Sequence, residues 1–155
     1  MNTFKGVRRR FEFIVRKGAT ILIDDYAHHP AEIRAFLGSV REIFPDRKIT
    51  CIFQPHLYTR TRDFATEFSE SLSIADEVIL LPIYPARELP IPGVSSEMLL
   101  EKIKAPDKKV CGKEELLDEL KKRMLDVVVT VGAGDIDQLV APIARMLNER
   151  AQKRS

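Results

Sequence analysis

Short apolar runs rich in β-branched residues alternate with longer amphipathic runs along this chain, and this alternation restricts the possible folds most strongly. Strands are expected at 11–15, 20–23, 48–53, 77–81 and 127–131, with a very short one at 109–111. Helices are expected at 30–44, 61–73, 95–103 and 114–124, and from 136 onward. The pattern predicts an α/β fold, a doubly wound, mostly parallel Rossmann-like sheet with helices on both faces. The first two strands, separated by 16–19 with Gly18 in the turn, add an antiparallel edge hairpin.

The amphipathic runs also predict which side chains face the core. Pro30 suits a first helical position and Pro45 ends that helix, whereas Thr61 is a plausible cap for the next one. The expected inward side chains are Ile33, Phe36, Leu37, Val40, Ile43 and Phe44, then Phe64, Phe68 and Leu72, then Leu116, Leu117, Leu120 and Met124.

The length of 155 residues fits one domain, which we place at 1–155 with flexible segments at 1–8 and 150–155. The charged opening segment, Lys5–Arg10, indicates a piece of a longer protein to which Met1 was added as a start. A net charge of +2 is too balanced to favour nucleic acid or an anionic membrane as a partner. No apolar run approaches the roughly 20 residues of a membrane span, and no signal peptide is present, so a cytoplasmic location is expected. Cys51 and Cys111 are expected to be two reduced thiols.

Polar side chains gather where three predicted strands end. These segments are Asp24–His29, Gln54–Arg60 and Gly132–Asp135, and the first two hold all three histidines. In open α/β sheets, ligands bind outside the carboxyl ends of the strands. The three segments are therefore expected to share one edge of the sheet and to form a ligand site.

Each of these segments allows more than one interpretation. Asp24 and Asp25 either close a strand or provide a carboxylate that accepts from ribose hydroxyls. Arg60 and Arg62 either pair with a carboxylate or phosphate or are solvated, and the run Arg8–Arg10 is usual for an exposed surface.

The histidines, His28, His29 and His56, lack a further ligand type at diagnostic spacing, which disfavours a metal site. Contacts to a polar substrate are the more plausible role, and plain surface positions are the remaining one.

The glycine-rich turn Gly132–Gly134 is weak evidence for a dinucleotide, because Asp137 stands where the fingerprint requires glycine. The sequence contains no phosphate-binding loop of the Gly-x-x-x-x-Gly-Lys-Ser/Thr type and no nucleophile elbow. If this chain contacts ATP, it lacks the usual means of holding the phosphates.

Seven motifs in order through almost the whole chain resemble the carboxy-terminal domain of the Mur ligase family, in the group that joins L-alanine to UDP-N-acetylmuramate. They are Arg9–Glu12, Asp24–Pro30, Phe53–His56, Tyr58–Arg62, Ile83–Arg87, Pro90–Ser96 and Gly132–Ile136. The Asp-Asp-Tyr-Ala-His-His-Pro and Gln-Pro-His segments separate this group from ligases that add later amino acids. The resemblance implies an ATP-dependent enzyme of peptidoglycan synthesis that proceeds through an acyl phosphate. It also implies that the amino-terminal domain and the central ATPase domain, which holds Mg²⁺, are absent here, so the isolated domain is expected to be inactive.

The resemblance also implies a role for individual residues. Arg10 matches the catalytic arginine that reaches the ATP phosphates on domain closure, and Asp25 matches the ribose-binding carboxylate. Tyr26, His28, His56 and Arg60 match the L-alanine end of the site. The implied partners are L-alanine, UDP-N-acetylmuramate, ATP and the missing domains, with no metal ligand in this chain.

One position departs from the family, which often has arginine where this chain has Leu57. Placement of the alanine carboxylate is therefore expected to depend more on Arg60. Two alternatives remain open, a recycling ligase that joins a tripeptide to the same sugar nucleotide and a nucleotide-binding module with no reaction.

Overall fold

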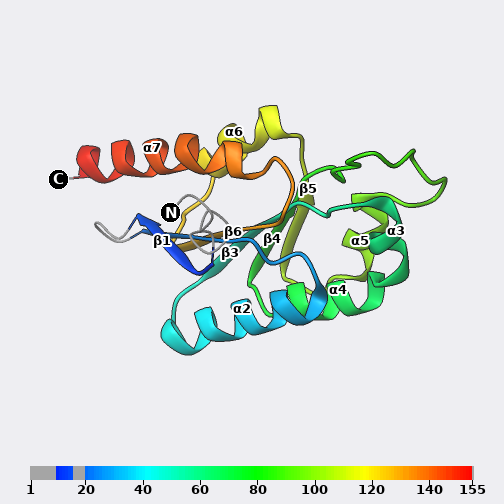
Figure 1. Ribbon diagram of the computed structural model, residues 1–155. Coiled ribbons are helices and arrows are strands. Elements are labelled where there is room, and N and C mark those ends of the chain that lie inside the picture. Colours follow the sequence, from blue (N-terminus) through cyan, green and yellow to red (C-terminus); the bar gives the residue numbers. More distant parts are fainter. Residues whose placement is uncertain (1–9, 16–19, 155) are drawn as a thin grey trace, which may run out of the picture.

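A computed structural model describes residues 10–15 and 20–154, and its centre is a six-stranded sheet in the order β1-β2-β6-β3-β4-β5 (Figure 1). β1 pairs with β2 in antiparallel fashion and the other strands are parallel. This confirms the predicted fold class and edge hairpin. The turn residue Gly18 and the opening segment 1–8, which includes Arg8, lie outside the described residues. The strands are β1 (Glu12–Val15), β2 (Ile21–Asp25), β3 (Ile49–Phe53), β4 (Glu77–Leu80), β5 (Asp107–Val110) and β6 (Val127–Val131).

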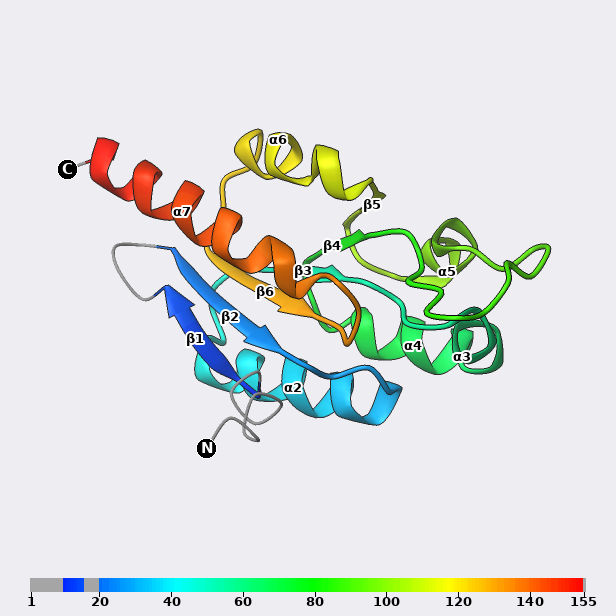
Figure 2. The ribbon, with the colours of Figure 1, turned by 45° about the horizontal axis from the view of Figure 1, so that its top comes forward.

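Helices cover both faces of the sheet (Figures 1 and 2). One face carries α2 (Pro30–Ile43), α3 (Tyr58–Asp63), α4 (Ala65–Leu72) and α5 (Ser96–Lys102); the other carries η2 (Lys113–Glu115), α6 (Leu116–Lys121) and α7 (Asp137–Arg154). Alternate residues of each strand point to opposite faces. In β6, Val127 and Val129 pack toward α2 and α4, whereas Val128 packs toward α6 and α7. β6 therefore consists almost entirely of valine because both faces of this strand are buried.

The helix that follows β6 covers the face opposite to the helices that follow β2 and β3 (Figure 2). β6 lies between β2 and β3 in the sheet, so neighbouring strands send their connections to opposite faces. Such divergence opens a crevice at the carboxyl ends of the strands, which is where doubly wound folds place their ligands.

Three details differ from the sequence-based expectation. The predicted helix 61–73 is two helices that meet at Phe64, and Thr61 lies inside α3, where its hydroxyl donates to the Leu57 carbonyl at 2.8 Å. Ile43, Phe64 and Met124, expected to be inward, are 52%, 40% and 79% exposed. Ile43 and Met124 lie at the ends of their amphipathic runs, and Phe64 lies at the junction of α3 and α4.

The polar tail continues the last helix. α7 extends through Arg154 and so includes most of the segment 150–155 that the sequence predicted to be flexible. Glu149–Lys153 are mostly strong helix formers. Arg150 also ties the helix to its neighbour, donating to the Arg123 carbonyl at 3.0 Å.

Cys51 and Cys111 are free and buried, in accord with the prediction of two unpaired thiols. Within the described part of the chain, no helix is long and apolar enough to cross a bilayer.

Candidate functional site

The three polar segments start side by side, as predicted. Asp25 at the end of β2 is in register with Val131 of β6, which is in register with Phe53 of β3. The loops that follow these strands therefore leave the same edge of the sheet.

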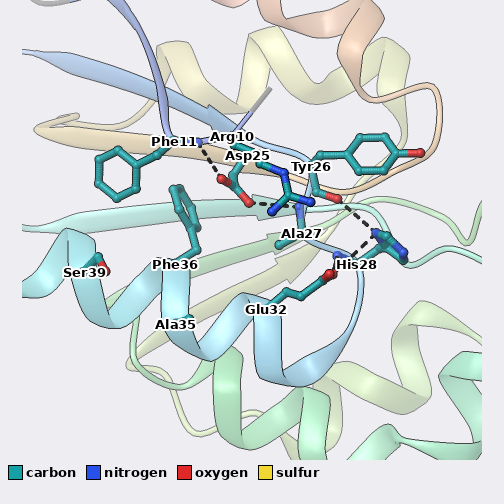
Figure 3. Close-up of a pocket in the computed structure, with 10 residues that line it drawn as sticks. All are labelled: Arg10, Phe11, Asp25, Tyr26, Ala27, His28, Glu32, Ala35, Phe36 and Ser39. Carbon is teal, nitrogen blue, oxygen red and sulfur yellow. Dashed lines mark hydrogen bonds and ion pairs between the residues drawn. The ribbon is translucent and has the colours of Figure 1, made fainter. Parts of the chain in front are cut away.

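An open pocket of about 380 Å³ lies beside the end of β2 and the first half of α2 (Figure 3). Its wall is formed by Arg10, Phe11, Asp25, Tyr26, Ala27, His28, Glu32, Ala35, Phe36 and Ser39. The pocket thus contains four of the six residues that the sequence nominated. Figure 3 shows one end lined by the Phe11 and Phe36 rings and the other by polar groups of Arg10, Asp25 and His28.

Asp25 has its carboxylate oriented by two backbone groups. Oδ1 accepts from the Phe11 N–H at 2.5 Å and Oδ2 accepts from the Ala27 N–H at 3.0 Å. Burial raises the pKa of Asp25 above its usual value, although these two bonds and the nearby Arg10 guanidinium oppose the change. Each oxygen accepts one of these two bonds from the described residues, and a carboxylate oxygen can accept a second, from a ligand hydroxyl.

Asp24 has the structural role that the sequence left open for both aspartates. It is buried, and its Oδ1 accepts from the Thr130 hydroxyl of β6 at 2.7 Å. The alternation of strand side chains places it on the opposite face of the sheet from Asp25. The structure therefore separates the two residues by environment.

Glu32 in the first turn of α2 was missed by the sequence reasoning. Its Oε1 accepts from the backbone N–H groups of His28 at 3.0 Å and His29 at 3.1 Å. These two bonds lower the pKa of Glu32 against the opposing effect of partial burial. An acidic residue three positions after the residue that precedes a helix is the sequence signal for such a cap.

His28 is held in place by its neighbours. Its Nδ1 lies 3.1 Å from the Tyr26 carbonyl oxygen, and its ring contacts the Tyr26 ring edge to face at 5.3 Å. The His56 ring is 6.4 Å from that of His28. The loop after β2 and the loop after β3 therefore face each other through their histidines.

His56 and Arg60 form the other half of the nominated set. The Arg60 guanidinium lies 3.1 Å from His56 Nδ1, one helical turn away. A guanidinium can only donate, so Nδ1 carries the lone pair and the proton of the neutral ring is on Nε2. Burial and the positive charge of Arg60 lower the pKa of His56 against the opposing effect of the Glu88 carboxylate, and the lower pKa favours the neutral ring.

The glycine-rich turn after β6 is fixed by Gln54, a further residue whose role the sequence did not reveal. Its amide donates to Asp135 Oδ1 at 2.7 Å, and its carbonyl accepts from the Ile136 N–H at 2.9 Å. Lys113 pairs with the other Asp135 oxygen, and the two contacts lower the pKa of Asp135 against the effect of burial. Side chains from η2 and from the residue after β3 therefore hold this turn in place. A glutamine directly after a predicted strand was the available signal in the sequence.

Arg62 is exposed and pairs with its neighbour Asp63 rather than facing the pocket. Within residues 10–15 and 20–154, no group of three or more His, Cys, Asp or Glu side chains is arranged to hold a metal ion.

Residues 9–134 match the family model described as Mur ligase, glutamate ligase domain. The chain is 56% identical over 153 residues to the UDP-N-acetylmuramate–L-alanine ligase of Parabacteroides distasonis, covering 99% of this chain and 33% of that protein. It is 51% identical over 153 residues to the enzyme of the same name from Cytophaga hutchinsonii, with the same two coverages. The chain thus spans about a third of the length of these curated relatives.

Among solved structures, the fold is similar to that of the UDP-N-acetylmuramate–alanine ligase of Thermotoga maritima. The TM-score is 0.66 at 30% sequence identity, and the match covers 95% of this chain and 30% of that one.

Proposed function

The chain belongs to the Mur ligase family, and from this premise we propose that it acts as the carboxy-terminal domain of a UDP-N-acetylmuramate–L-alanine ligase. The observation that carries the proposal is the identity of 56% and 51%, across 99% of the chain, to two relatives with that name. The Asp-Asp-Tyr-Ala-His-His-Pro and Gln-Pro-His segments support the same choice within the family.

In the proposed reaction, a carboxylate oxygen of UDP-N-acetylmuramate attacks the terminal phosphorus of ATP, and ADP leaves. The resulting acyl phosphate is attacked by the neutral alanine amine, and inorganic phosphate leaves. This chain contributes one wall of the site, and the absent domains contribute the sugar nucleotide site, the phosphate loop and the Mg²⁺ ligands. The reaction belongs in the cytoplasm, where ATP and the sugar nucleotide are present.

Arg10 and Asp25 are the residues proposed to contact ATP. Both line the pocket of Figure 3, and the carboxylate of Asp25 keeps acceptor capacity for ribose hydroxyls. The Arg10 side chain is exposed and can extend to a phosphate oxygen when the domains close.

Tyr26, His28, His56 and Arg60 are proposed to hold L-alanine. Arg60 binds the amino-acid carboxylate without taking part in proton exchange, because a guanidinium stays charged. His56, neutral and protonated on Nε2, adds a second donor beside it. Fixing the carboxylate orients the amine for attack on the acyl phosphate.

The proposal is tested by replacing the corresponding third of the Parabacteroides distasonis ligase with this chain and measuring alanine-dependent ADP release with UDP-N-acetylmuramate. The chimera should turn over, and the ligase truncated before this domain should not. Arg10→Ala should lower kcat by about 10²-fold, the typical loss of an electrostatic contact to the transition state. Unchanged turnover for both Arg10→Ala and Asp25→Ala would refute the assigned roles.

The same assay separates the alternatives. A recycling ligase would prefer the tripeptide when alanine and tripeptide compete. For a nucleotide-binding module, the 155-residue chain alone would bind ATP with submicromolar Kd in calorimetry. We expect weak ATP binding and no ADP release from the chain alone, because it contains no phosphate loop.

A further inference from the structure

The loop that follows β4 is hydrogen-bonded to the segment that carries His56 and Arg60. Glu88 lies in this loop, and its Oε1 accepts from the N–H groups of Tyr58 at 2.6 Å and Thr59 at 3.1 Å. Its Oε2 accepts from the Thr59 hydroxyl at 2.5 Å. One carboxylate thus binds three donors at the start of α3, the helix that bears Arg60.

Tyr84, in the same loop, contacts this segment as well. Its carbonyl accepts from the Leu57 N–H and its own N–H donates to the Pro55 carbonyl, both at 2.8 Å. Its ring stacks on His56 with 5.6 Å between centroids and 11° between planes. The backbone bonds flank His56, and the ring covers it.

The segment from His56 to Arg60 contains a residue with a strained backbone. Leu57 has a φ of 77°, a backbone conformation that is strained for a residue with a Cβ. The Leu57 carbonyl accepts from both the N–H and the hydroxyl of Thr61, at 3.2 and 2.8 Å. Such a conformation persists only where surrounding contacts impose it, and here Tyr84, Glu88 and Thr61 supply those contacts.

We propose that Tyr84 and Glu88 are positioning residues that fix the hydrogen-bonded His56–Arg60 pair and thereby set the affinity of the site for its amino acid. Without them the segment would relax toward an unstrained Leu57. This would turn the start of α3 and separate Arg60 from Nδ1 of His56. The link to amino-acid affinity rests on the proposed function, whereas the link to the His56–Arg60 geometry does not.

The geometric part is tested on the 155-residue chain with ¹⁵N-labelled histidine. In the wild type, the His56 nitrogen shifts should report a proton on Nε2 alone. Glu88→Ala should populate both tautomers, whereas Glu88→Gln should resemble the wild type, because its amide oxygen can accept from the same two N–H groups. Tyr84→Leu is a second variant. It should change the His56 signals while the backbone hydrogen bonds of position 84 to Pro55 and Leu57 remain.

The control is Glu101→Ala, an exposed glutamate on α5. Identical His56 shifts in Glu88→Ala, Tyr84→Leu and the wild type, all folded by circular dichroism, would overturn the proposal.

The affinity part is tested in the chimeric ligase. Glu88→Ala should raise the KM for alanine roughly tenfold and leave the KM for ATP and for UDP-N-acetylmuramate within about twofold, with most of the loss restored by Glu88→Gln. Equal changes in all three constants, or none in the KM for alanine, would overturn the role in amino-acid binding. A wild-type chimera without turnover would instead reject the proposed function, and the histidine spectra would still decide the positioning role.

Discussion

At the scale of single residues, two adjacent aspartates show how strand geometry assigns different tasks to identical side chains. Asp24 is buried and accepts a hydrogen bond from the Thr130 hydroxyl, whereas Asp25 faces the pocket and accepts from two backbone N–H groups. A change at Asp24 would therefore act on the sheet, and a change at Asp25 would act first on the site.

Asp25→Asn should make folding stability depend less on pH. Burial raises the folded-state pKa of Asp25 above 3.8, so the carboxylate favours folding when protonated, and this contribution is lost as the pH rises through the folded pKa. Asparagine is neutral throughout. As the pH rises from 3 to 7, the free energy of unfolding of Asp25→Asn, measured in urea, should therefore increase relative to that of the wild type. A difference that is constant with pH would contradict this.

Gly134→Ala should destabilise the fold by about 1–3 kcal/mol. A Cβ at this position would overlap Gln54 Oε1 and lie 2.8 Å from Tyr84 Cβ, which would displace the glutamine that fixes the turn. The matched control is Gly38→Ala in α2, where nothing lies within 4 Å of the new Cβ. That variant should be more stable by roughly 0.5–1 kcal/mol. Urea denaturation measures both, and equal effects would contradict the steric argument.

At the scale of elements, α2 begins with a carboxylate that ties the helix to the loop bearing His28 and His29. Glu32→Gln should lower the free energy of unfolding at pH 7 by under about 1 kcal/mol, because the side chain is 44% exposed and screened by solvent. The folded-state pKa lies below 4.5, so the contribution is present above pH 4.5 and lost as the pH falls through the folded pKa. The variant and the wild type should therefore converge at acid pH. Glu42→Gln, exposed on the same helix, is the matched control for the substitution itself.

Most elements could be predicted because each amphipathic period reports burial against the sheet. The break between α3 and α4 could not, since residues 61–73 read as one periodic run. α3 ends at Phe64, whose φ of −120° is outside the helical range. It begins after the strained Leu57, which long-range contacts with the loop after β4 hold in place. Periodicity carries no information on such contacts.

Part of the candidate site could be predicted as well. The strand ends indicated its edge, and the motifs nominated Arg10, Asp25, Tyr26 and His28, which line one pocket in the structure. Glu88 and Lys113 act through partners about 30 and 22 positions away, so no local pattern identifies them.

At the scale of the whole molecule, each face of the sheet has its own apolar layer, and each layer contains one thiol. Cys51 lies among side chains on the α2 face and Cys111 among those on the α7 face. Burial raises the pKa of Cys51 to about 12 and that of Cys111 above its usual value. Both thiols are therefore poor nucleophiles in the folded chain.

Thiol reactivity should consequently report on opening of the two layers. In native buffer, a disulfide-exchange reagent should react slowly with both cysteines, and the rates should rise together through the urea unfolding transition. Single variants Cys51→Ala and Cys111→Ala assign each rate. Fast reaction of one thiol in the native chain would show that its layer opens independently, contrary to cooperative unfolding.

The bridge between His56 and Tyr84 extends the parallel ladder of β3 and β4 beyond the ends of those strands. These positions therefore lose their backbone conformational entropy when the chain folds rather than when a substrate arrives. A substrate that meets this wall needs to order fewer groups, so more of its contact energy remains as affinity.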